Sequence, residues 1–137
     1  MKCRLIAFLC VLTALSVNAV EVSDRLLYAI KMAESGCKSD AIGDNSKAVG
    51  ILQLHKVYVD DANRIVGYKK YSYNDRYDVR KSEEMTRLVL THYGKHYKRI
   101  TCKRCTDEIL ARIHNRGFSQ WNDKLGERYW NKVKQFM

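Results

Sequence analysis

Glu34 is the residue whose type and position best suit acid chemistry. It follows Ile30 by four residues and Leu27 by seven, a spacing that places the three side chains on one face of a predicted helix. Burial on this apolar face favours the protonated carboxyl group, and the negative end of the helix dipole acts in the same direction. A carboxyl group that keeps its proton near neutral pH can act as a general acid. The competing interpretation is a glutamate at a helix end that turns to solvent.

Asp44 is the candidate for a second carboxylate at the same site. It lies ten residues after Glu34, in the turn-rich stretch Gly43-Asp44-Asn45-Ser46. Two carboxyl groups in different surroundings can divide acid and base roles between them. An aspartate in a turn often only bonds its own backbone, so a purely local role is the alternative.

The elements that must position these residues are mostly helical. Hydrophobic periodicity predicts about five helices and one small β-hairpin or extended segment near residues 42–54, hence a mostly α domain with a minor β part. Helix-capping residues supply the predicted boundaries. The predicted elements are a helix capped by Ser23 and ended by Gly36, a helix over residues 55–65, a tyrosine-rich loop over 66–81, helices capped by Ser82 and Thr106, and a last helix that carries Tyr129 and Val133.

The first 19 residues have the order of a secretory signal peptide. Lys2 and Arg4 precede an apolar run over residues 5–17, and Val17-Asn18-Ala19 places small residues where a signal peptidase reads them. The run is shorter than the ~20 residues of a membrane-spanning helix. We therefore expect a secreted, extracellular protein with two parts, a signal peptide over residues 1–19 and a single domain over residues 20–137.

Charge and cysteines narrow the partners of that domain. The formal net charge of the whole chain is +10, which favours polyanions, and secretion makes nucleic acid the least suitable of them. Removal of the signal peptide leaves Cys37, Cys102 and Cys105, for which we expect one disulfide and one free thiol. The pair Cys102 and Cys105 has half the pattern of a zinc site but no second pair of ligands, so we expect no metal.

Four motifs in one order identify a family resemblance. They are Glu34-Ser35-Gly36-Cys37, the run from Ala48 to Leu54, Ala111-Arg112-Ile113-His114-Asn115, and Tyr129-Trp130-Asn131-Lys132-Val133. The set resembles the lysozyme-like superfamily, most closely invertebrate-type lysozymes and related phage and bacterial muramidases, and more distantly soluble lytic transglycosylases and goose-type lysozymes. The resemblance covers residues 26–136 and implies a lysozyme-like α+β fold.

The resemblance also implies roles for individual residues. Glu34 falls on the catalytic acid, and Asp44 falls within about a residue of the second carboxylate of invertebrate-type enzymes. Substrate-binding positions fall on Ser35, Gln53, His114 and Asn115. The implied reaction is hydrolysis of the β-1,4 bond between N-acetylmuramic acid and N-acetylglucosamine in bacterial peptidoglycan, an antibacterial or digestive activity without metal or organic cofactor. We expect a monomer that binds the anionic cell wall, without nucleic acid partner or membrane contact.

Departures from the family pattern keep alternatives open. After Asn115 the chain continues Arg116-Gly117-Phe118 where invertebrate-type enzymes have glycines and a proline, and it has few cysteines for that group. One alternative is therefore a catalytically weak or inactive protein of the same fold that binds cell walls. A second is a lytic transglycosylase, although His114 stands where those enzymes have tyrosine. A third is a cationic antimicrobial protein that acts without catalysis.

Overall fold

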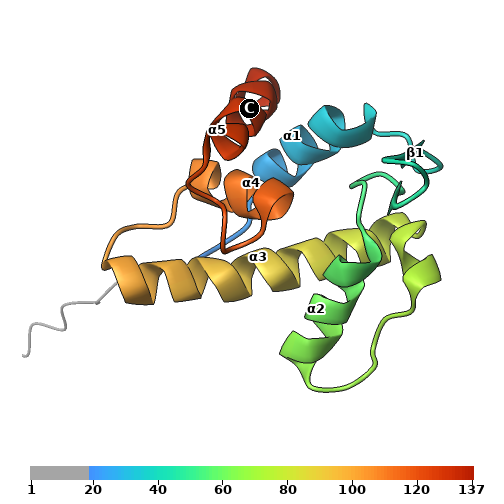
Figure 1. Cartoon of the computed structure of the whole chain (residues 1–137), viewed down its shortest axis with the longest axis horizontal. Coiled ribbons are helices and arrows are strands. Elements are labelled where there is room, and N and C mark those ends of the chain that lie inside the picture. The colour runs from blue at the N-terminus through green and yellow to red at the C-terminus, as the bar shows by residue number, and fades with distance from the viewer. Residues whose placement is uncertain (1–18) are drawn as a thin grey trace, which may run out of the picture.

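Five α-helices and one small β-hairpin make up the domain (Figure 1), as the hydrophobic pattern predicts. The structure is a computed structural model that describes residues 19–137, so nearly all of the predicted signal peptide lies outside the described residues. No helix of the described part is both long and apolar enough to span a membrane. The elements in chain order are α1 (Asp24–Ser35), β1 (Ile42–Gly43), β2 (Ala48–Val49), α2 (Lys56–Val66), the 3₁₀ turn η1 (Tyr73–Arg76), α3 (Val79–Thr101), α4 (Asp107–Arg116), α5 (Lys124–Val133) and the 3₁₀ turn η2 (Lys134–Phe136).

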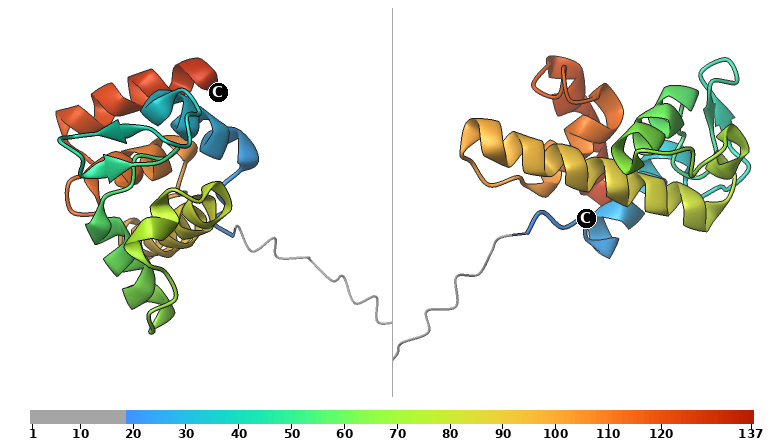
Figure 2. Two further views of the ribbon diagram at one scale, coloured as in Figure 1. Left: turned by 90° about the vertical axis from the view of Figure 1, so that its right-hand side faces the viewer. Right: turned by 90° about the horizontal axis from the view of Figure 1, so that it is seen from below.

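Helix α3 is the long central element against which the others are arranged. Its 23 residues span roughly 34 Å at the usual helical rise. Helices α2 and α4 both pack on it, and α5 packs on α4 and α1. Figure 2 shows the hairpin beside the C-terminal end of α1, with α5 running along the other side of that helix. The end of α1, where Glu34 lies, is therefore enclosed by the hairpin and the C-terminal helices.

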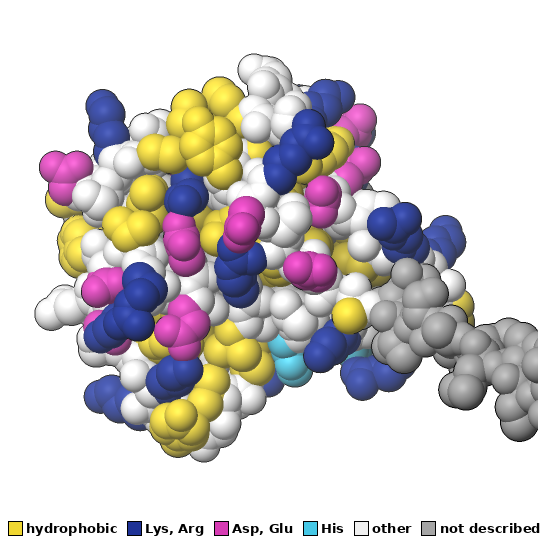
Figure 3. Space-filling view, turned by 180° about the vertical axis from the view of Figure 1, so that it is seen from behind, with side chains coloured by type: hydrophobic (Ala, Val, Ile, Leu, Met, Phe, Trp, Pro, Cys, Tyr) yellow, Lys and Arg dark blue, Asp and Glu magenta, His cyan; other side chains and the backbone are white. Residues whose placement is uncertain are grey.

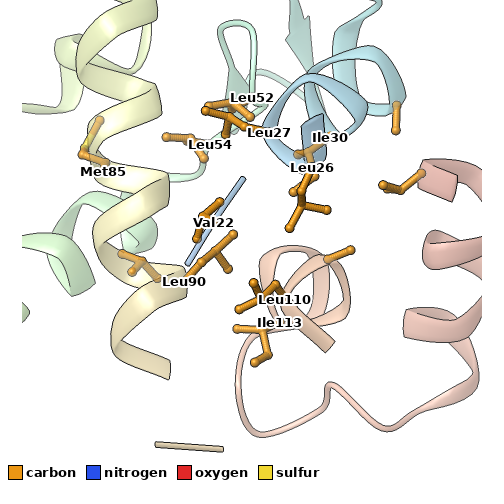
Figure 4. Close-up of a cluster of buried hydrophobic side chains, with 14 of the residues drawn as sticks. Val22, Leu26, Leu27, Ile30, Leu52, Leu54, Met85, Leu90, Leu110 and Ile113 are labelled. Carbon is orange, nitrogen blue, oxygen red and sulfur yellow. The ribbon is translucent and has the colours of Figure 1, made fainter. Parts of the chain in front are cut away.

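The core joins apolar side chains from α1, α3, α4 and the segment after β2 (Figure 4). Leu26 and Ile30 of α1 are fully buried, and Leu90 of α3 and Leu110 of α4 are buried with them. Leu52 and Leu54 are buried in the same cluster, so the hairpin segment is attached to the helical core directly. This attachment fixes the short hairpin relative to α1, which two residue pairs of sheet could not do alone.

Capping side chains set most helix boundaries. Ser23 accepts a hydrogen bond from the Leu26 amide at 3.1 Å, and Thr106 accepts one from the Ile109 amide at 3.4 Å, which confirms both predicted caps. The predicted cap of the third helix is wrong. Helix α3 begins at Val79 with Asp78 as its N-cap, because the Asp78 carboxylate already accepts from the Lys81 amide at 2.9 Å. Ser82 is buried inside the first turns of this helix.

The hairpin has a tight turn with unusual backbone conformations. β1 and β2 pair antiparallel, with Ile42 opposite Val49 and Gly43 opposite Ala48. Asp44, Asn45 and Ser46 in the turn all have left-handed φ angles, of 47°, 51° and 68°. Such conformations are costly for residues other than glycine and persist only where the surroundings enforce them. The turn therefore depends on the packing of the segment that follows it.

Arg76 and Gly50 provide that packing. The Arg76 guanidinium is buried and donates to three backbone carbonyl groups, those of Lys47, Leu54 and Tyr73, at 2.7 to 3.1 Å. Gly50 has a φ of +80°, and a Cβ atom there would lie 2.0 Å from the Arg76 carbonyl oxygen. The backbone of η1 thus approaches the hairpin segment more closely than a side chain would allow.

The cysteines do not form the expected disulfide. Cys37, Cys102 and Cys105 are all free thiols in this structure. Cys102 ends α3 with an exposed side chain, whereas Cys105 is half-buried beside Gly94 of the same helix. The turn between α3 and α4 thus places its two thiols in different surroundings.

Candidate active site

Glu34 lies in the last turn of α1, which ends at Gly36. Its side chain is 17% exposed, so it is largely enclosed without being sealed from solvent. The Tyr129 hydroxyl group, from α5, donates a hydrogen bond to Glu34 Oε1 at 2.7 Å. The His114 ring, from α4, places Nε2 at 3.7 Å from the same oxygen. The carboxyl group of Glu34 is therefore contacted by two helices, α4 and α5, that lie far from α1 in the sequence.

Burial raises the pKa of Glu34 above its usual value. The hydrogen bond from Tyr129 and the positive charge of Lys132 act in the opposite direction but are smaller effects. The protonated carboxyl group is thus favoured by its surroundings, in the sense that the sequence predicts for a general acid. The tyrosine bond has a second use, because it stabilises the carboxylate once the proton has left.

His114 is a buried, neutral partner of Glu34. Its side chain is 3% exposed, and burial lowers the pKa of its imidazole to about 4. The contact with Glu34 is therefore one between a carboxyl group and a neutral ring, not an ion pair. His114 Nδ1 lies 3.4 Å from the Tyr58 hydroxyl oxygen, and the two rings meet edge to face.

Four helices each contribute one polar side chain to this cluster. Tyr58 comes from α2, His114 from α4, Glu34 from α1 and Tyr129 from α5. Burial raises the pKa values of both tyrosines, so their hydroxyl groups keep their protons and remain donors. The cluster contains a single carboxyl group, surrounded by neutral hydrogen-bonding groups.

Asp44 occupies a more open position than Glu34. Its side chain is 53% exposed, and its carboxylate lies 3.3 Å from His55 Nε2 at the start of α2. Asp40, a third carboxylate between Glu34 and Asp44 in the chain, is also exposed. Among the contacts of the described residues, Asp44 is engaged by His55, whereas Glu34 is engaged by Tyr129 and His114.

Ser35 and Gln53 hold the hairpin segment beside Glu34. The Ser35 hydroxyl group donates to the Ile51 carbonyl at 2.8 Å and so ties the end of α1 to that segment. Gln53 donates through Nε2 to the carbonyls of Ala41 at 3.1 Å and Gly50 at 2.8 Å. Both side chains therefore have structural partners, and their predicted contacts with substrate stay predictions.

Asn115, Tyr129 and Tyr58 differ in how far the sequence predicts their place in the site. Asn115, predicted to bind substrate, is exposed at the end of α4 beside His114. Tyr129 is predicted only as part of a motif on the last helix, and its bond to Glu34 joins residues 95 apart in the chain. Tyr58 carries no signal beyond its place in a predicted helix. Only the packing of α2, α4 and α5 around α1 could show these two contacts.

In the described part of the chain, no group of three or more His, Cys, Asp or Glu side chains is placed to hold a metal ion.

The chain matches the family model described as Transglycosylase SLT domain over residues 16–137. Comparisons with curated proteins and with solved structures give no significant match.

Proposed function

This chain belongs to the Transglycosylase SLT domain family, and we propose that it is a lytic transglycosylase that cleaves the glycan strands of bacterial peptidoglycan. The family places the chain among lysozyme-like, peptidoglycan-cleaving domains. The finer assignment rests on one observation, the single buried carboxyl group of Glu34 among neutral partners. Secretion, predicted from the first 19 residues, is part of the proposal because peptidoglycan lies outside the cytoplasm.

In the proposed reaction Glu34 serves first as acid and then as base. Its protonated carboxyl group gives a proton to the oxygen of the β-1,4 bond between N-acetylmuramic acid and N-acetylglucosamine, and the bond to C1 of the muramic sugar breaks. The resulting carboxylate then accepts the proton of the muramic 6-hydroxyl group as that oxygen attacks C1. The product is a 1,6-anhydro ring, and no water is consumed.

Tyr129 and His114 are positioning residues in this scheme. The Tyr129 hydroxyl donates to Glu34 Oε1, and the same oxygen faces His114 Nε2. Within the described chain these contacts reach Oε1 and leave Oε2 as the oxygen for the proton transfers. The Tyr129 bond strengthens when Glu34 becomes a carboxylate, because a charged acceptor forms the stronger hydrogen bond.

The second candidate is a hydrolase of the invertebrate lysozyme type, which the motifs resemble. In that reaction Asp44 would direct water or stabilise the charged sugar. The observation in its favour is that Asp44 is held in a constrained turn by His55, and not left loose on the surface. A catalytically inactive wall-binding protein is the third candidate, and the enclosed, hydrogen-bonded Glu34 argues against it.

The products of digestion distinguish these candidates. We expect mass spectrometry of digested peptidoglycan to show anhydro-muropeptides, which are lighter than hydrolysis products by one water. Glu34→Gln should abolish cleavage, since an amide has no proton to give, a loss of about a hundred-fold or more. Asp44→Asn should retain most of the activity.

Other outcomes would contradict the proposal in different ways. Reducing ends as the main products, together with loss of activity in Asp44→Asn, would establish the hydrolase. Cleavage by Glu34→Gln at the wild-type rate would remove Glu34 from the mechanism. Absence of any cleavage by the folded wild-type protein would leave a wall-binding protein.

A further inference from the structure

A basic groove runs along the solvent-facing side of α3, away from the Glu34 cluster. Its volume is about 500 Å³, and it is lined by one side of α3 between Arg87 and Arg99 and by Ile65 of α2. The buried residues of α3, Met85, Val89 and Leu90 among them, are not part of its lining. Figure 3 shows a histidine side chain beside lysine and arginine side chains at the lower edge of the molecule.

The basic side chains of the groove follow one row of the helix. Arg87, Lys95 and Arg99 share positions four residues apart, with Thr91 at the remaining position of the row. Each step of four residues advances roughly 6 Å along a helix, so the three charges form a line. A second row, adjacent to the first, carries His92 and His96.

These charges are only partly neutralised within the protein. Arg87 pairs with Asp24 at the start of α1. Arg99 contacts His96 Nδ1 at 2.6 Å. This contact leaves the positive charge of Arg99 without a paired carboxylate among the described residues. Over the described residues no Asp or Glu lines the groove, and Lys95 and Arg99 are both exposed. Asp24 beside Arg87 and Asp61 near His92 are the acidic groups close to the groove, and the positive charge of Lys95 and Arg99 remains to attract a linear polyanion.

We propose that this groove binds the phosphodiester chain of an anionic cell-wall polymer and anchors the enzyme while Glu34 acts on the adjacent glycan. The proposal rests on the proposed function for its biological setting, because peptidoglycan as substrate brings the chain to such polymers. Arginine suits phosphate oxygens through paired hydrogen bonds, and lysine suits them as a point charge. The linear arrangement of the charges matches a polymer better than a single small anion.

A matched pair of double variants tests the groove. Lys95→Gln with Arg99→Gln removes two exposed charges four residues apart on α3, and Lys124→Gln with Arg128→Gln removes the same charges at the same spacing on α5. Binding of purified poly(glycerol phosphate) to the full chain would be measured by calorimetry at low salt. We expect at least about tenfold weaker binding for the α3 variant, since a basic residue near a polyanionic surface contributes close to a factor of five. The α5 variant should bind like the wild type.

Further measurements separate this proposal from the proposed function. The α3 variant should cleave peptidoglycan stripped of phosphate polymers at the wild-type rate, and Glu34→Gln should bind the polymer normally. Equal loss of binding in both double variants would overturn the proposal, because net charge alone would then explain it. No binding by the wild type would also overturn it. Tighter binding to phosphatidylglycerol vesicles than to the polymer, with the same loss in the α3 variant, would assign the groove to a membrane instead.

Discussion

At the scale of single residues, the proton on Glu34 is set by opposing influences. Burial favours the neutral carboxyl group, while the Tyr129 hydrogen bond and the Lys132 charge favour the carboxylate. Because burial dominates, the folded state holds this proton more tightly than the unfolded chain does. Once that proton is lost, the folded protein contains a carboxylate in an unfavourable place, so the proposed catalytic group costs stability.

Replacing Glu34 by glutamine should therefore stabilise the protein. The amide keeps an oxygen for the Tyr129 hydroxyl and has no charge to bury, so we expect a gain of about 1 kcal/mol in unfolding free energy at pH 7.5. The gain should shrink as the pH falls and vanish below the carboxyl pKa of the unfolded chain. Denaturant unfolding at several pH values measures it, with Asp44→Asn as a control at an exposed carboxylate. A destabilised glutamine variant would show that burial does not dominate.

His114 should make the protein sensitive to acid. Its pKa falls from 6.5 to about 4 on folding because of burial, so protonation favours the unfolded chain. Stability is therefore complete above pH 6.5 and is lost as the pH falls from 6.5 toward 4, by as much as roughly 3 kcal/mol. His114→Gln should remove most of this loss in urea unfolding at pH 7, 5.5 and 4. An equal pH dependence in wild type and His114→Gln would contradict the assignment.

At the scale of elements, the contact between the hairpin segment and η1 depends on Gly50. Gly50→Ala should cost clearly more than the ~1 kcal/mol of a strained backbone alone, because the added methyl group meets the Arg76 carbonyl. Gly67→Ala is the matched control, since Gly67 has a φ of +89° but no atom near the added carbon. Thermal unfolding of both variants checks the difference. Equal losses of stability in the two variants would mean that the backbone of η1 does not approach Gly50 closely.

Elements are predictable from the sequence where the interactions that define them are short in range along the chain. Ser23, Gly36 and Thr106 act within one helical turn, so capping rules locate them from sequence. The predicted N-cap of the third helix is wrong because Asp78 and Ser82 both offer a capping side chain. Only the folded protein, in which Ser82 is buried, decides between them. Glu34 could be predicted from the apolar spacing of α1. Its partner Tyr129 could not, because no local pattern encodes how α5 packs on α1.

At the scale of the whole molecule, the formal net charge is +10, of which only Lys2 and Arg4 lie in the predicted signal peptide, and this positive charge should attract substrates that carry many negative charges. We expect lysis of intact cell walls to fall as salt is added, because charges beyond a Debye length of ~8 Å are screened at physiological ionic strength. Cleavage of soluble peptidoglycan fragments should be much less sensitive. Turbidity and fragment assays run over one salt series provide the measurement. The same salt dependence for both substrates would mean that the positive charge does not serve to attract the enzyme to intact cell walls.

Two properties of the whole molecule depend on long-range packing that the sequence does not encode locally. The cysteine count predicts one disulfide among Cys37, Cys102 and Cys105, but all three of these thiols are free. The basic groove was visible in the sequence only as a high net charge. Its line of residues appears once α3 is known to run unbroken from Val79 to Thr101 and to expose that side.

The left-handed backbone of the hairpin segment makes the two sides of the proposed site, this segment and α1, differ in mobility. Five residues other than glycine between positions 37 and 53 adopt positive φ angles, and the sheet that joins them has only two residue pairs. The turn over residues 44–46 is exposed, strained and outside the two ladder pairs, so it can open while Leu52 and Leu54 keep the rest of the segment attached to the core. Its amide hydrogens should exchange with solvent well before those of α1, which carries Glu34. A bound glycan chain would slow that exchange, so α1 is the fixed wall of the proposed site and the hairpin turn is the part that fluctuates beside it.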